Sequence, residues 1–257
     1  MDFSVSLSRK PAERARLVSV QWLRGLAALM VVVHHILVYT NQGVGLGIDA
    51  PRVLFGFDAW HFGLHIFFLV SGFIMITTVT EFGSFRAAIG FAERRLVRIV
   101  PLYWLITSVA VAAALLSPSS IQIAGDRFQY FLDSYLFIPA LRAPGDARPV
   151  LGQGWTLNCE MVFYALFALS LLLPRRKALA FLAIAFAGLC FMGRYVTIET
   201  PVLYTWTDGI LLEFGLGVVV GLIYQAGWRL SRALACASIV AGFALISLAW
   251  QGPVVLV

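Results

Sequence analysis

The amino-acid sequence predicts an all-α bundle of transmembrane helices. Of its 257 residues, 60% are hydrophobic and only 12% are charged, and the mean hydropathy is +0.87. Soluble domains are nearer half apolar and a quarter charged, so this composition is typical of a protein embedded in a bilayer. Apolar runs long enough to cross a hydrocarbon core of about 30 Å also recur along the chain.

Seven apolar runs predict about seven spans. They cover residues 21–39, 62–79, 102–117, 155–173, 178–193, 209–225 and 233–250. We expect residues 1–20 to form a cytoplasmic lead and residues 118–154 to form the longest external loop. Residues 1–257 are predicted to make a single membrane-embedded domain.

The basic residues predict the orientation of these spans. The chain holds 19 Lys and Arg against 13 Asp and Glu, and fourteen of the basic residues fall in segments 1–24, 80–100, 174–177 and 228–232. The positive-inside bias therefore places the N-terminus in the cytoplasm. Membrane topology accounts for the excess of basic residues, so we expect no nucleic-acid partner. The three cysteines have no metal-like spacing, so we expect neither a disulfide nor a metal site.

The first span contains ionisable residues within "QWLRGLAALMVVVHH" (21–35). Arg24 and His35 are eleven residues apart, which is close to three helical turns, so both lie on one face about 16 Å apart. His34 points about 100° away from His35. Buried charges usually pair or line a cavity, which favours a functional pair. Alternatively, Arg24 extends to the headgroups and the histidines bond neighbouring helices.

Counting residues from the span ends places His35, Glu160 and Glu213 at one depth near the outer face, with His65 close to it. A carboxylate beside an imidazole raises its basicity, as general-base catalysis requires. The alternative is an ion pair that holds the bundle together.

A second cluster lies at the predicted cytoplasmic end, in "RRLVRIVPLYW" (94–104), which we interpret as a basic helical turn ending at Pro101. Arg95 and Arg98 share a helical face, and guanidinium groups suit phosphate recognition. The alternative is a topological anchor that follows the positive-inside bias.

Five blocks carry a resemblance to a known family. They are "LRGLAALMVVVHH" (23–35), "FFLVSGFIM" (67–75), "RRLVRIVPLYW" (94–104), "GWTLNCEMVFYALFAL" (154–169) and "LLEFGLGVVVG" (211–221). In this order they resemble the acyltransferase-3 family of integral membrane O-acyltransferases, and within it the exopolysaccharide-production acetyltransferases. That family has about ten spans and a late Gly-x-x-Ser-Tyr block, so we expect a C-terminally shortened version of a ten-span fold.

The resemblance implies a reaction. An acyl group, usually acetyl, passes from acyl-coenzyme A to a hydroxyl of a polysaccharide or of its lipid-linked precursor, with no permanently bound cofactor. The family's Arg-x10-His pattern falls on Arg24 and His35, which makes His35 the candidate base or acyl relay. Its R-x-x-R pattern falls on Arg95 and Arg98, the candidates for the coenzyme phosphates.

The family's W-[ST]-L-x-x-E block adds Glu160 as a catalytic candidate and Trp155 as a supporting one. Glu213 and His34 complete the supporting candidates. We expect a multi-pass protein of a bacterial inner membrane; no oligomeric state is predicted. Two other interpretations stay open. The chain is a non-catalytic component of polysaccharide transport or assembly, or it is an inactive truncated paralogue.

Overall fold

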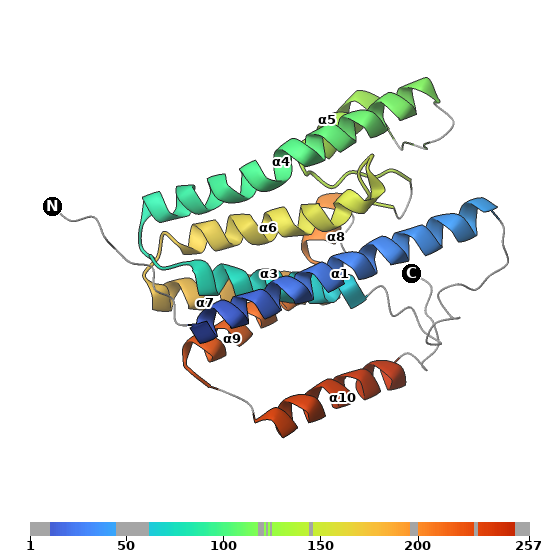
Figure 1. Ribbon diagram of the computed structural model, residues 1–257. Coiled ribbons are helices and arrows are strands. Elements are labelled where there is room, and N and C mark those ends of the chain that lie inside the picture. The colour runs from blue at the N-terminus through green and yellow to red at the C-terminus, as the bar shows by residue number, and fades with distance from the viewer. Residues whose placement is uncertain are drawn as a thin grey trace. The chain divides into compact units, whose positions relative to one another are not determined.

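The computed structural model describes residues 11–44, 62–117, 121, 123, 125–143, 146–195, 200–228 and 231–249. The regular elements in these ranges are helices, which confirms the all-α prediction (Figure 1). They are α1 (Pro11–Val44), α3 (Phe62–Thr78), α4 (Phe85–Leu116), α5 (Arg127–Tyr135), the 3-10 turn η3 (Gly152–Gly154), α6 (Trp155–Ser170), α7 (Arg175–Tyr195), α8 (Pro201–Trp206), α9 (Leu211–Gln225) and α10 (Arg232–Ala249).

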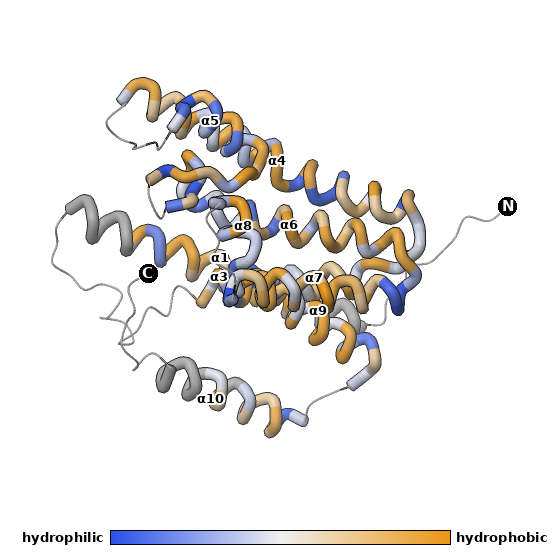
Figure 2. Tube along the Cα trace, turned by 180° about the vertical axis from the view of Figure 1, so that it is seen from behind, coloured by the Kyte–Doolittle hydropathy of each residue, from blue (hydrophilic) through white to orange (hydrophobic). Residues whose placement is uncertain are grey.

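The predicted apolar runs all fall on these helices. Within the described ranges, four segments are long and apolar enough to cross a membrane, namely Val18–Ile36 of α1, α4, α7 and Pro201–Gln225. Shorter apolar helices are α3 and residues 232–242 of α10, and α6 has 16 residues. Figure 2 shows hydrophobic stretches along α4 and α6. The count of seven spans stays a prediction.

α1 begins at Pro11, so part of the predicted lead is helical, and residues 1–10 and 45–61 lie outside the described ranges. One predicted boundary is wrong. α4 continues through Pro101 instead of ending there. Proline removes one backbone donor, but a helix tolerates that loss where packing around it compensates. Tyr103, two residues after Pro101, is buried in such packing.

The predicted external loop contains a helix that the sequence analysis missed. The side chain of Asp126 accepts a hydrogen bond from the backbone N–H of Gln129 and caps α5. Trp104 Nε1 donates to the carbonyl of Tyr135 at 2.9 Å, and Tyr103 Oη donates to the carbonyl of Ser134 at 2.8 Å. These bonds fix α5 beside the second half of α4.

The chain divides into two compact units, which are described separately. Unit 1 comprises residues 1–71 and 220–257, and unit 2 comprises residues 72–219. In unit 1, α1 and the first part of α3 approach closely at Gly63, where an added Cβ would lie 2.6 Å from the carbonyl oxygen of Ala27. Small residues permit such contact between membrane helices. Whether the full chain is one domain stays a prediction.

α6 lies at the centre of unit 2. Phe163 stacks on Phe214 of α9, with 4.1 Å between ring centroids, and on Phe186 of α7 at 5.8 Å. Phe167, also on α6, meets Phe91 of α4 at 5.0 Å. All five rings are buried. Without a hydrophobic driving force between helices in lipid, such packing is a main source of their association.

Contacts between side chains give the helix directions in unit 2. Gly193 of α7 approaches Thr207, while Phe186, two turns earlier on α7, contacts Gly215 of α9, so α7 and α9 are antiparallel. The short turn at 171–174 makes α6 and α7 antiparallel as well. α6 and α9 are therefore parallel neighbours.

Several helix ends of unit 2 gather at one end. The backbone N–H groups of Gly83 and Ser84 donate to the carbonyl of Leu171 at 2.8 and 3.0 Å, which ties the α3–α4 turn to the end of α6. Gly83 has a φ of 75°, a conformation that favours glycine. α7 begins beside this turn at Arg175, so the basic segments 80–100 and 174–177 share one end.

Candidate active site

The structure confirms that Arg24 and His35 lie on one helical face, because α1 is continuous through both residues. The guanidinium carbon of Arg24 lies 5.8 Å from the centroid of the Phe67 ring on α3. A cation at this distance from an aromatic face is attracted by the ring electrons. Phe67 therefore holds Arg24 within the unit, as a structural partner that the sequence analysis did not identify.

The two histidines touch each other. Their ring centroids are 5.4 Å apart in an edge-on arrangement, and both side chains are half-buried. His35 lies about three turns beyond Arg24 along α1, and His34 projects to the side. A half-buried imidazole keeps one edge accessible to a substrate, as a group that takes up a proton requires.

His65 does not share the level of His35, contrary to the prediction. Gly63 packs against Ala27 and Met30, and Phe67 lies at Arg24, so α1 and α3 are antiparallel with His65 between these two contacts. His35 is five residues beyond Met30, which adds about 7 Å along the axis. The close contact at Gly63 sets this register, and counting from span ends does not detect it.

In unit 2, Glu160 is bound by a residue one turn away. Glu160 is 4% exposed, and its Oε1 accepts a short hydrogen bond from Tyr164 Oη. The two residues are four apart on α6, which places them on the same face. A buried carboxylate is costly unless such a donor satisfies it. Tyr164 therefore fixes both the position and the hydrogen bonding of Glu160.

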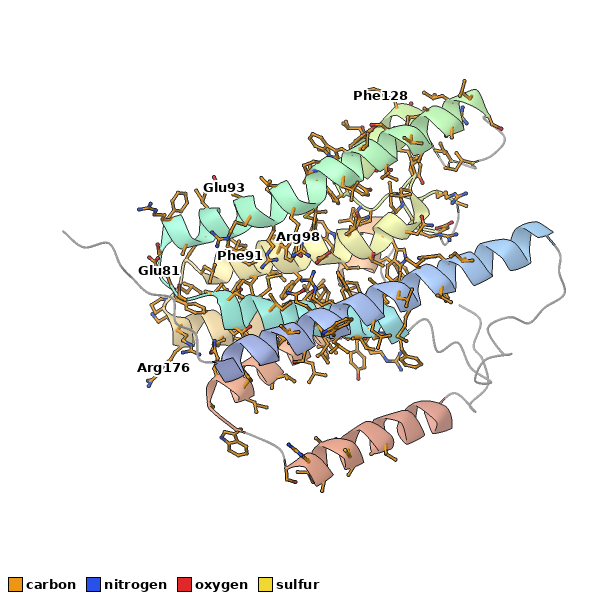
Figure 3. All side chains as sticks on the ribbon, viewed as in Figure 1. Glu81, Phe91, Glu93, Arg98, Phe128 and Arg176 are labelled. Carbon is orange, nitrogen blue, oxygen red and sulfur yellow. The ribbon has the colours of Figure 1, made fainter. Side chains whose placement is uncertain are left out.

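The guanidinium of Arg95 lies against the same tyrosine. Its carbon is 5.8 Å from the centroid of the Tyr164 ring and 5.5 Å from that of Phe91. Figure 3 shows Phe91 and Arg98 on the side of α4 that faces α6. Arg98 is exposed, whereas Arg95 is half-buried. Tyr164 thus joins the predicted phosphate-binding arginine to the predicted catalytic carboxylate.

Glu213 lies in the first turn of α9, and its Oε2 is buried. Its neighbour Phe214 stacks on Phe163, which is three residues after Glu160 on the parallel helix α6. The stacking places Glu213 and Glu160 at nearly the same level along the two helices, as the sequence predicts.

Trp155 is the first residue of α6, directly after η3, and its backbone N–H donates to the carbonyl of Gly152. A Cβ added at Gly154 would lie 3.0 Å from atoms of both Pro149 and Tyr103, so the loop packs tightly over this helix start. The loop positions Trp155 at the end of unit 2 opposite the basic segments.

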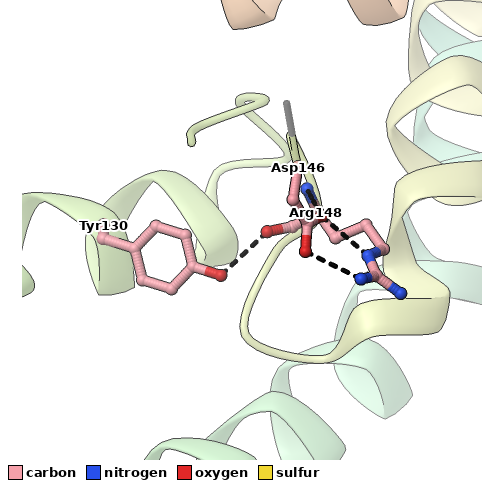
Figure 4. Close-up of polar contacts among 3 residues, drawn as sticks. All are labelled: Tyr130, Asp146 and Arg148. Atoms are coloured by element: carbon pink, nitrogen blue, oxygen red, sulfur yellow. Dashed lines mark hydrogen bonds and ion pairs between the residues drawn. The ribbon is translucent and has the colours of Figure 1, made fainter. Parts of the chain in front are cut away.

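An ion pair orders this loop (Figure 4). Arg148 Nε and Nη2 donate to the two carboxylate oxygens of Asp146, each at 2.7 Å, and Tyr130 Oη donates to the Arg148 carbonyl at 2.8 Å. The hydrogen bond from the Arg148 side chain lowers the pKa of Asp146, and burial raises the pKa of Tyr130. Asp146 is therefore ionised at neutral pH.

The predicted residues fall into two groups. Arg24, His34 and His35 belong to unit 1, and Trp155, Glu160, Glu213, Arg95 and Arg98 belong to unit 2. Unit 2 brings Arg95 and Glu160 together through a shared partner. The sequence contained a signal for this partner, because Tyr164 follows Glu160 by one turn on the same face.

The chain is similar in sequence to known proteins. A family model described as "Acyltransferase domain" matches residues 17–257. The exopolysaccharide production protein ExoZ of Rhizobium meliloti (strain 1021) is 40% identical over 192 residues, which cover 72% of this chain and 58% of that protein. Acyltransferase MdmB of Streptomyces mycarofaciens is 27% identical over 243 residues, covering 85% of this chain and 60% of that protein. No solved structure matches.

The chain spans about three fifths of the length of these two relatives. The family match, however, covers nearly all of the chain and includes α1 with its Arg24–His35 face and α6 with Glu160. Together with the apolar helices, this match shows that the chain belongs to the acyltransferase-3 family of membrane proteins.

Proposed function

We propose that this chain forms the acyl-transferring part of a membrane O-acyltransferase, which moves an acyl group, most simply acetyl, from acyl-coenzyme A to a hydroxyl group. The contact of Tyr164 with both Arg95 and Glu160 is the main support. It connects a cationic group suited to a phosphorylated donor with a buried carboxylate suited to acid–base chemistry.

Arg95 and Arg98 would bind the phosphates of the donor. Guanidinium groups match phosphate geometry with paired donors, and such charge-assisted hydrogen bonds are about twice as strong as neutral ones. The rings of Phe91 and Tyr164 hold Arg95 in place before the donor arrives. Less side-chain entropy is then lost on binding, which strengthens the interaction.

His35 would act as the general base. It takes the proton of the acceptor hydroxyl while the hydroxyl oxygen attacks the thioester carbonyl carbon. The carbon–sulfur bond then breaks, and the thiolate of coenzyme A leaves and takes up a proton. Arg24, about 16 Å away on the same face of α1, would bind a more distant part of the substrates. Glu160, held by Tyr164 in unit 2, would serve as a second acid–base group of the reaction.

The acceptor that we propose is a hydroxyl of a cell-surface polysaccharide or of its lipid-linked precursor. The relative ExoZ is named as an exopolysaccharide production protein, which supports this class of acceptor. We also propose a bacterial inner membrane as the location, with the N-terminus in the cytoplasm. This orientation brings the basic end of unit 2 to the side where acyl-coenzyme A is made.

The test compares polysaccharide from cells with and without the gene. We expect an ester-linked acetyl group, removable by mild alkali, that disappears with the gene and returns with the wild-type chain. The Tyr164→Phe chain should restore less of it. Polysaccharide that is exported in smaller amount but with unchanged acetyl content would contradict the proposal and indicate a transport component. An unchanged product in both respects would indicate an inactive chain.

A further inference from the structure

A cavity of about 660 Å³ opens at the end of unit 2 where α3 and α6 end and α4 begins. Its wall is made by the α3–α4 turn, by the first three turns of α4 and by Leu171 after α6. It is separate from the cluster of Arg95, Tyr164 and Glu160, none of which lines it. Because helix ends gather here, we expect the cavity to lie at the level of the lipid headgroups.

The charged lining of this cavity is balanced. Arg86 and Arg94 contribute two positive charges, and Glu81 and Glu93 contribute two negative charges. Figure 3 shows Glu81 at the turn before α4 and Glu93 on α4 itself. A lining without net charge is a poor match for a polyanion such as coenzyme A. It matches a ligand that carries one charge of each sign.

Gly90 keeps the cavity open between the two arginines. Arg86, Gly90 and Arg94 follow one another at intervals of four residues and share a face of α4. The Arg94 side chain bends back over the glycine, and a Cβ added at Gly90 would lie 3.2 Å from Arg94 Nη1. A larger side chain at Gly90 would therefore occupy the space between the guanidinium groups.

The cavity also has an apolar rim. Phe85 is 71% exposed and Ile89 is 42% exposed, although both lie at the cavity mouth on a membrane helix. Apolar side chains at such a position fit hydrocarbon better than water. The lining thus combines a charged interior with an apolar rim, as an amphiphilic ligand requires.

We propose that this cavity binds a zwitterionic glycerophospholipid whose headgroup carries a phosphate and a primary ammonium. Arg86 and Arg94 hold the phosphate, and Glu81 and Glu93 accept hydrogen bonds from the ammonium. The acyl chains leave past Phe85 and Ile89 into the bilayer. The inference goes beyond the proposed acyl transfer and does not require it.

The test measures lipid that stays bound to the purified chain, with native mass spectrometry in nanodiscs of phosphatidylethanolamine and phosphatidylglycerol. We expect the wild-type chain to retain phosphatidylethanolamine preferentially. Arg86→Gln plus Arg94→Gln should lower its retention about tenfold, since two charge-assisted contacts are lost. Arg176→Gln plus Lys177→Gln, which removes equal charge at the neighbouring turn, should change it less than about twofold.

A second variant separates binding from folding. Gly90→Leu occupies the space between the two guanidinium groups and retains every charge, and leucine is a better helix former than glycine. We expect it to reduce phosphatidylethanolamine retention as strongly as the arginine pair. Equal retention of phosphatidylglycerol by the wild-type chain, or displacement of the lipid by acetyl-coenzyme A, would overturn the proposal. Unchanged retention in Gly90→Leu would overturn it as well.

Discussion

Tyr164 donates a hydrogen bond to the buried carboxylate of Glu160 from one helical turn away on α6. The same ring lies against the guanidinium of Arg95 on the neighbouring helix α4. This relationship couples the arginine proposed to bind the donor phosphates to the carboxylate proposed for acid–base chemistry.

Replacing Tyr164 with phenylalanine should reduce acyl transfer about tenfold or more, because a hydrogen bond to a charged group is worth about 1.5–3 kcal/mol. The ring remains, so Arg95 retains its aromatic contact. The measurement is the rate of transfer from acetyl-coenzyme A by the purified chain. Tyr195→Phe, at an exposed tyrosine of α7, is the control and should be unaffected. If both variants lose activity equally, Tyr164 has no specific role.

Replacing Arg95 and Arg98 together with alanine should weaken acyl-coenzyme A binding by about 1.5–3 kcal/mol or more, as expected for lost phosphate contacts. Arg175→Ala plus Arg176→Ala removes the same charge at another turn and is the matched control. Isothermal titration with acetyl-coenzyme A gives both affinities. Equal losses in the two doubles would show that Arg95 and Arg98 act only as topological anchors.

The packing of unit 2 predicts a difference between two glycines of α7. Gly193→Ala would place its Cβ 2.3 Å from the carbonyl oxygen of Thr207, whereas Gly188 has nothing within 4 Å. Overpacking of this kind costs about 1–3 kcal/mol. We expect Gly193→Ala to lower the melting temperature in detergent and Gly188→Ala to leave it unchanged or raise it. Similar melting temperatures would contradict the close contact between Gly193 of α7 and Thr207, the residue that follows α8.

The orientation prediction uses two exposed residues at opposite ends of unit 2. Phe128 on α5 is 75% exposed, and Arg176 lies at the start of α7. In a background without native cysteines, a cysteine at Phe128 should react with an impermeant maleimide in intact cells. One at Arg176 should react only after lysis. The reverse pattern would place the N-terminus outside and remove the basis of the donor site.

Several features could be predicted from sequence because they depend on one helix alone. The face shared by Arg24 and His35 follows from the 3.6-residue period of the helix. The apolar runs found from hydropathy each fall on a helix of the structure. α5 was missed because it is short, although Asp126 and Gln129 are spaced as a helix start requires.

Features that depend on the axial register between two packed helices could not be predicted from the sequence. Counting from span ends places His65 close to the level of His35, but the contact of Gly63 with Ala27 sets a different register. Tyr164 was overlooked because its role depends on Arg95, which lies far away in sequence and meets it only after α4 and α6 pack.

The central claim is that His35 acts as the general base. It shares a face of α1 with Arg24, and the adjacent His34 touches its ring but projects to another side. A hydroxyl is a poor nucleophile near neutral pH, and loss of a positioned base typically lowers the rate about 10²–10⁴-fold. The two histidines therefore form a matched pair, with the same chemistry on different faces of one helix.

The most direct measurement is the rate of acetyl transfer by His35→Ala and His34→Ala, compared at equal amounts of membrane-inserted protein. We predict that His35→Ala loses about 10²–10⁴-fold in rate, while His34→Ala keeps most of the wild-type activity. Glu160→Gln should resemble His35→Ala, because the amide keeps the shape and loses the charge. An inactive His34→Ala beside an active His35→Ala would contradict the catalytic assignment and the helical-face argument behind it.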